Sequence, residues 1–212
     1  MTMLQLKPKE QSFVQIAREI KRLRAIILCE GDQDIETLKA LIGKASVQIV
    51  GIIGLTDCEG APQLDEMSAY VASLVRNSRR LEKIVLITDA DTHQASQRVN
   101  SLRDSLRANG VHIRNPRIIS GSIYSSHFEG TRFLIKVAGK MELPFRSHEM
   151  EDYAVHLLIS RGEIQEGRLK GFHKASDLII HLGKKVETII QESQGEEVEA
   201  SYENVLNLLR II

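Results

Sequence analysis

The stretch Ile84-Val-Leu-Ile-Thr-Asp-Ala-Asp91 decides the fold, because a continuous apolar run leads directly into two acids. A short apolar run of this kind, rich in β-branched residues, is typical of a buried strand. The same arrangement occurs upstream, where Ala25-Ile-Ile-Leu-Cys29 is followed by Glu30 and Gly31. The sequence therefore predicts two buried strands that end in acidic residues.

Strand and helix signals alternate through the first 125 residues. After the first strand, apolar residues recur at helical spacing as far as Gly43. The β-branched run Val47 to Ile53 and the helical pattern between Leu64 and Val75 form another such unit, and a short strand is expected at 117–119. Strands that are apolar on both faces and joined by helices favour parallel pairing with helices on both sides. We therefore expect an α/β fold whose mostly parallel sheet has about four strands flanked by helices.

The alternation stops near residue 125. We expect residues 1–125 to form the α/β core with an N-terminal helix, and residues 126–212 to form a mostly helical extension. The extension is expected to pack on the core because the apolar faces of its helices need a partner. Arg132 to Ala138 is a candidate for one more strand. Helices are expected in the extension over residues 151–160, 175–191 and 202–212.

Charge and composition exclude several classes of protein. The 28 Lys and Arg balance the 28 Asp and Glu, which argues against a bulk polyanion binder. The aromatic residues are few, with 4 Tyr, 5 Phe and no Trp, which argues against base stacking as the main mode of ligand recognition. Two cysteines, Cys29 and Cys58, are too few for a disulfide framework and are expected to be reduced core residues. The longest apolar run, Ile49 to Leu55, is too short to cross a bilayer, and no signal sequence is indicated. We expect a cytoplasmic protein without a membrane span.

Three acids follow two of the expected strands, at the sheet edge where open α/β folds bind ligands: Glu30 after the first strand, and Asp89 and Asp91 after the third. Adjacent parallel strands bring these carboxylates within several ångströms of one another, and alternation along a strand end aims both aspartates toward one pocket. Gathered carboxylates repel one another, so their pKa values rise or a cation lies among them. Oxygen ligands favour Mg²⁺ or Mn²⁺. Turn acids without a chemical role remain the alternative.

The order of these motifs resembles the Toprim domain of topoisomerases, bacterial primases, overcoming-lysogenization-defect nucleases and ribosomal RNA maturation nucleases. The resemblance covers about residues 24–125, from the strand before Glu30-Gly31 through the strand that leads into Asp89-Ala-Asp91. It implies a Rossmann-like sheet in which Glu30 acts as general acid or base. It also implies that Asp89 and Asp91 hold Mg²⁺ for phosphodiester transfer or hydrolysis.

The chain departs from this family at His93, where a third acid commonly follows the two aspartates. His93 is expected to be a solvated turn residue, and the topoisomerase branch is therefore disfavoured. Glu151 and Asp152, at the start of an expected helix, are candidates to complete the metal site, or else acids that complement the helix dipole. Asp57 and Glu59, where the family's middle loop would lie, are weaker candidates.

Arginines recur on the second and third expected helices, and their spacing indicates a solvated face. They are Arg76, Arg79, Arg80, Arg98, Arg103 and Arg107. The alternative is that some of them flank the acidic pocket and guide a phosphate backbone. The expected function is Mg²⁺-dependent phosphodiester hydrolysis or phosphoryl transfer on nucleic acid or nucleotides. The alternative is a non-catalytic module that binds metal, nucleotide or a partner protein within a nucleic-acid-processing assembly.

Overall fold

The computed structural model describes residues 3–5, 18–19, 21–45, 47, 53–57, 64–78 and 80–212. For residues 3–5 and 53–57 the backbone alone is described. Most of the expected N-terminal helix therefore lies outside the described residues, as do Cys58 and Glu59.

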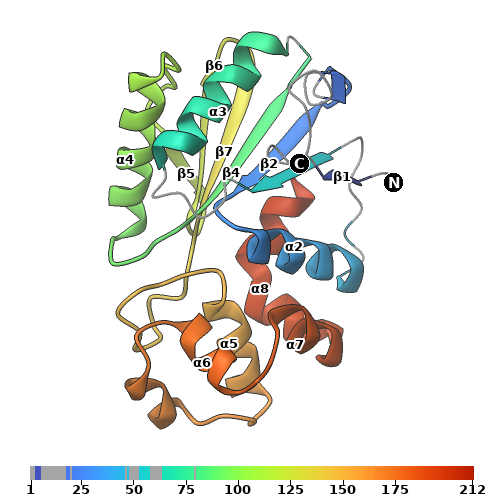
Figure 1. The fold of residues 1–212 in the computed structure, drawn as a ribbon, viewed down its shortest axis with the longest axis vertical. Coiled ribbons are helices and arrows are strands. Elements are labelled where there is room, and N and C mark those ends of the chain that lie inside the picture. The colour runs from blue at the N-terminus through green and yellow to red at the C-terminus, as the bar shows by residue number, and fades with distance from the viewer. Residues whose placement is uncertain are drawn as a thin grey trace.

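Within the described part of the chain, seven strands form one sheet. They are β1 (Met3–Gln5), β2 (Ala25–Cys29), β3 (Ile53–Asp57), β4 (Lys83–Asp89), β5 (Arg117–Ser120), β6 (Ile123–Phe128) and β7 (Thr131–Ala138). Their order across the sheet is β1-β3-β2-β4-β7-β6-β5 (Figure 1). The first five in this order are parallel, whereas β6 and β5 are antiparallel to their neighbours. The expected α/β class with a mostly parallel sheet is confirmed, but the expected number of strands is wrong.

Helices cover both faces of the sheet. Alternate side chains of a strand point to opposite faces, so each central strand contributes to two core clusters. Ile26 and Leu28 of β2 join a core cluster with α3 (Leu64–Asn77) and α4 (Ala95–Ala108). Ile27 and Cys29 join a second cluster with α2 (Asp32–Lys44) and the C-terminal helices. In Figure 1, α3 and α4 lie together in the upper left of the view, whereas α2 and α8 lie together below them. This double burial explains why the central strands are continuous apolar runs.

The C-terminal part of the chain adds further helices to the α2 face. They are α5 (Asp152–Ser160), the 3-10 helix η1 (Glu166–Gly171), α6 (Ala175–His181), α7 (Val186–Glu192) and α8 (Gly195–Arg210). No helix of the described residues is long and apolar enough to span a membrane.

The sheet continues past the boundary expected at residue 125. β7 lies inside the sheet, between β4 and β6, so the α/β part of the chain extends to Ala138. The helical part accordingly begins after Ala138 and not at residue 126. The alternation of strands and helices ends earlier because β6 and β7 form an antiparallel hairpin, which needs no helical connection.

Candidate functional site

Glu30 and Asp89 lie at the carboxyl edge of the sheet, at the ends of two adjacent parallel strands, β2 and β4, and the charge of Glu30 acts on Asp89. Leu28 is paired with Leu86, so both strands reach this edge together. The Thr88 hydroxyl donates a hydrogen bond to Glu30 Oε1. The expected pairing of the two acid-ending strands is confirmed, since β2 and β4 are adjacent and parallel.

Five carboxylates, Glu30, Asp34, Asp89, Glu149 and Glu151, surround this edge, and we call them the acid cluster. Burial raises the pKa of Asp89 well above its ordinary value, and the negative charges of the other four raise it further. The Met150 amide donates to Asp89 Oδ1 at 3.0 Å, which fixes the side chain in place. The structure thus holds several mutually repelling acids within one partly buried region.

Two further members of the acid cluster have strongly shifted pKa values. Burial raises the pKa of Asp34 to about 7, although the Gly31 amide, which donates to its Oδ2 at 3.2 Å, acts in the opposite direction. Burial raises the pKa of Glu151 to about 8, and the charges of Glu149 and Asp34 add to this effect. A nearby cation would reverse these shifts by stabilising the ionised carboxylates.

Arg98 of α4 contacts the acid cluster from the α3 and α4 face. Its Nη2 lies 2.9 Å from Glu30 Oε1 and 3.3 Å from Asp91 Oδ2, and its Nε donates to Thr88 Oγ1 at 3.0 Å. Only 14% of its side chain is exposed. The expectation that Arg98 belongs to a solvated arginine face is therefore wrong, because α4 turns this position toward the ends of β2 and β4.

Asp91 and Asp89 have different surroundings. β4 ends at Asp89, and Asp91 has a left-handed backbone with φ of 53°. Its amide donates to the His148 carbonyl at 2.9 Å, and the His148 amide donates to the Asp91 carbonyl at 2.8 Å. The Asp91 side chain is 46% exposed and reaches Glu30 only through Arg98. Strand alternation does not govern its direction, because Asp91 lies beyond the strand.

Asp152 belongs to a buried pair with His148 and not to the acid cluster. Its Oδ2 accepts a hydrogen bond from the Lys140 amide at 2.8 Å and lies 2.7 Å from His148 Nδ1. Burial raises the pKa of Asp152 to about 6, against the opposing effect of those two contacts. The adjacent predicted acids thus separate, with Glu151 facing the acid cluster and Asp152 facing His148.

The acid cluster fits a hard divalent cation by its chemistry, since all its donors are oxygens. Among the described residues, no three His, Cys, Asp or Glu side chains are arranged to hold a metal ion. Mg²⁺ commonly binds through one or two carboxylates and completes its shell with water and phosphate oxygens. The acid cluster therefore suits an open magnesium site, with few protein ligands, better than a closed protein cage.

The remaining predicted residues lie around or outside this site. His93 is exposed, as expected. Asp57 ends β3 next to Cys29 of β2, but its side chain is outside the described part of the structure.

Sequence reasoning missed Asp34 and Glu149 and misjudged Arg98. Asp34 had a usable signal, since it is an acid in the first turn of the helix that follows Glu30. Glu149 had none, because a loop carries it to the site, where it accepts a hydrogen bond from the Ser176 amide at 2.6 Å and pairs with Lys174 at 3.5 Å.

A family model described as a protein of unknown function, DUF3226, matches residues 24–139. The match begins just before β2 and ends just after β7, so it contains the parallel centre of the sheet. The chain belongs to the DUF3226 family. Within the DUF3226 segment lie Glu30, Asp89 and Arg98, whereas Glu149 and Glu151 follow it. Comparison with curated proteins and with solved structures gave no match.

Proposed function

We propose that this DUF3226 protein catalyses Mg²⁺-dependent phosphodiester hydrolysis or phosphoryl transfer on nucleic acid or nucleotides. Its sheet is proposed to be a Rossmann-like core similar to the Toprim domain. The observation that carries the proposal is the position of Glu30 and Asp89 at the ends of adjacent parallel strands, with Arg98 bound to Glu30. Asp89 is the principal proposed metal ligand, and Asp91 and Glu151 are further candidates.

The chain's own groups supply positioning and proton transfer in the proposed reaction. Bound Mg²⁺ would polarise the phosphate and stabilise the leaving oxygen. Glu30 takes a proton from the attacking water while the water oxygen bonds to phosphorus. Glu30 then gives this proton to the oxygen that is released when its P–O bond breaks. The contacts of Thr88 and Arg98 with Glu30 hold this carboxylate in one orientation.

Arg98 is also suited to bind the substrate. Its guanidinium touches Asp91 at 3.3 Å, and the exposed part of Asp91 places this contact near solvent. Arginine binds phosphate oxygens through parallel hydrogen bonds as readily as it binds carboxylates. In the proposal, a phosphate of the substrate replaces Asp91 at Arg98 and releases Asp91 toward the metal.

Gly31 supports close approach of a ligand next to Glu30. Its backbone is extended, with φ of −147°, and a Cβ at this position would meet nothing within 4 Å. Neither the local conformation nor packing against the described residues therefore requires glycine. A missing side chain is useful where a ligand approaches the backbone closely.

The test is a cleavage screen on single- and double-stranded DNA and RNA with Mg²⁺. Glu30→Gln and Asp89→Asn are expected to lower the rate by about 100-fold or more, because each removes a group needed in the reaction. Glu203→Gln, on the exposed face of α8, is the matched control and is expected to keep the wild-type rate. Wild-type activity in either site variant, with circular dichroism showing an unchanged fold, would contradict the proposal.

A second candidate function is a metal- or nucleotide-binding module without catalysis. The ion pairs of Arg98 with Glu30 and Asp91 favour it, because they occupy two of the carboxylates that the reaction uses. Calorimetric titration of Mg²⁺ or Mn²⁺ into wild type and Asp91→Asn separates the two functions. Metal binding without turnover on any nucleic acid favours the module.

A further inference from the structure

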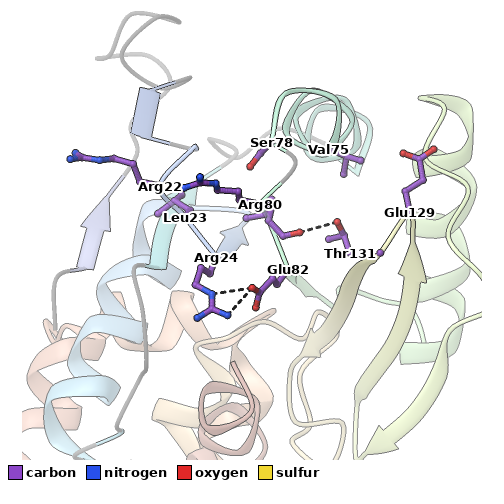
Figure 2. Close-up of a pocket in the computed structure, with 11 residues that line it drawn as sticks. Arg22, Leu23, Arg24, Val75, Ser78, Arg80, Glu82, Glu129 and Thr131 are labelled. Atoms are coloured by element: carbon purple, nitrogen blue, oxygen red, sulfur yellow. Dashed lines mark hydrogen bonds and ion pairs between the residues drawn. The ribbon is translucent and has the colours of Figure 1, made fainter.

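A basic pocket lies at the amino-terminal ends of β2, β4 and β7, whereas the acid cluster lies at the carboxyl ends of the strands (Figure 2). Its volume is about 760 Å³, and its lining includes Arg22, Arg24, Arg80, Glu82 and Glu129. β4 runs between the pocket and the acid cluster, and seven residues at about 3.3 Å each put them roughly 20 Å apart. The pocket is therefore separate from the acid cluster.

The two acids that line this pocket do not neutralise the positive charges of Arg22 and Arg80. Glu82 is engaged by Arg24, whose Nε and Nη2 both contact its Oε1, at 3.0 and 2.7 Å. Glu129 lies on the far side of the pocket from Arg22 in Figure 2. Arg22 makes a loose contact of 3.7 Å with Glu19 and is 71% exposed, and Arg80 makes no ion pair with any described residue.

An adjoining pocket of about 570 Å³ increases the positive charge of this region. It shares Arg22 and Arg80 with the first pocket and adds Lys21 and Arg76. All the described residues that line it are basic or neutral. The Arg76 guanidinium is held by the Asn109 carbonyl, to which its Nη2 donates at 3.2 Å, so this cation has a defined position. We call Lys21, Arg22, Arg76 and Arg80 the basic quartet.

The negative end of the α3 dipole lies near the basic quartet but balances only about half a unit charge. Four cations around two pockets that share lining residues suit a ligand that carries several negative charges. Guanidinium groups match phosphate oxygens in geometry, and two or more phosphates would neutralise the quartet. Ser78 borders both pockets and Asn77 the second, and both side chains are polar.

We propose that the basic quartet binds phosphate groups, either of a free diphosphate-like compound or of successive nucleotides in a nucleic-acid backbone. The proposal does not depend on the proposed cleavage reaction. If the source is a nucleic-acid backbone, the quartet is a second contact for the substrate, on the side of the molecule away from the acid cluster.

The test is calorimetric titration with inorganic pyrophosphate and with a single-stranded oligonucleotide, both in EDTA so that no metal site contributes. Arg22→Gln/Arg80→Gln is expected to weaken pyrophosphate binding by about tenfold or more, since two charge-assisted contacts are lost. The matched control is Arg117→Gln/Lys185→Gln, which removes the same charge from exposed positions elsewhere and is expected to bind as wild type. Glu30→Gln is also expected to bind pyrophosphate normally, so failure of the cleavage proposal is distinguishable from failure of this one.

The oligonucleotide distinguishes the two phosphate sources. If a backbone is bound, the salt dependence of log K becomes shallower by roughly 1.4 in the double variant, at about 0.7 per lost contact. If the oligonucleotide shows no such change while pyrophosphate binding falls, the ligand is a free phosphate compound. The proposal is overturned if wild type binds neither probe, or if the quartet and control variants behave alike.

Discussion

Two glycines flank the acid cluster and differ in what the fold requires of them. Gly139, directly after β7, has φ of +118°, and a Cβ there would lie 2.7 Å from the His148 Cβ. Gly31 has an extended backbone and open space. Of these two glycines, only Gly139 is therefore fixed by conformation and packing within the described structure.

Alanine substitution tests this difference. Gly139→Ala is expected to lower the free energy of unfolding by about 2 kcal/mol or more, because left-handed strain and a steric clash add. Gly31→Ala is expected to cost less than about 1 kcal/mol, the difference between the two residues at a helix N-cap, while lowering cleavage. Urea denaturation measures both. Equal destabilisation by the two substitutions would show that Gly31 is structural.

At the residue scale, the sequence was sufficient for acids that end neighbouring strands and insufficient for groups that a turn redirects. Glu30 and Asp89 follow from strand order and register alone. Asp91 does not, because its positive φ takes it out of the strand pattern and toward Arg98. Glu149 is likewise placed by a loop whose course no periodicity describes.

At the element scale, α4 brings a cation into the acid cluster through Arg98. We expect Arg98→Gln to bind Mg²⁺ several-fold more tightly, because the competing positive charge is gone, and to cleave about 10-fold more slowly, because a phosphate contact is lost. Arg98→Lys keeps the charge but not the planar fork, so intermediate behaviour is expected.

Calorimetry and cleavage rates measure these opposite effects in the same preparations. Arg103→Gln is the control, since Arg103 is on the same helix and pairs with Asp104 away from the site. Weaker Mg²⁺ binding in Arg98→Gln would mean that the arginine stabilises the metal-binding arrangement and does not compete with it.

The elements themselves were predictable to different degrees. β2, β4 and their helices have strong apolar periodicity, and the sequence located them closely. β6 is harder to recognise because Ser125, Ser126 and His127 interrupt its apolar pattern. The position of β7 between β4 and β6 is a matter of topology, which the composition of a single strand does not reveal.

At the scale of the whole molecule, the acid cluster makes stability depend on pH. The folded-state pKa values of Asp34, about 7, and Glu151, about 8, exceed their ordinary values of 3.8 and 4.5. The folded protein therefore holds more protons than the unfolded chain between these limits, and its stability falls as the pH rises through this range. Lys136 opposes this only above about pH 7, because burial lowers its pKa to about 7.

Thermal unfolding in EDTA is accordingly expected at a lower temperature at pH 7 than at pH 5. Mg²⁺ is expected to raise the midpoint more at pH 7 than at pH 5, because the ionised cluster binds it better. Asp34→Asn is expected to flatten the pH dependence, and Glu203→Gln to leave it unchanged. A midpoint independent of pH in wild type would contradict this account.

The place of β7 in the sheet also has a consequence for how the chain is made. β7 is synthesised after β5 and β6, yet it pairs with β4. At roughly 5–20 residues per second, a nascent chain carries β4 with one unpaired edge for a few seconds before β7 emerges. An unpaired strand edge is a template for association with other chains. Newly made molecules thus carry an edge open to association during this interval, and the pairing of β7 with β4 closes it.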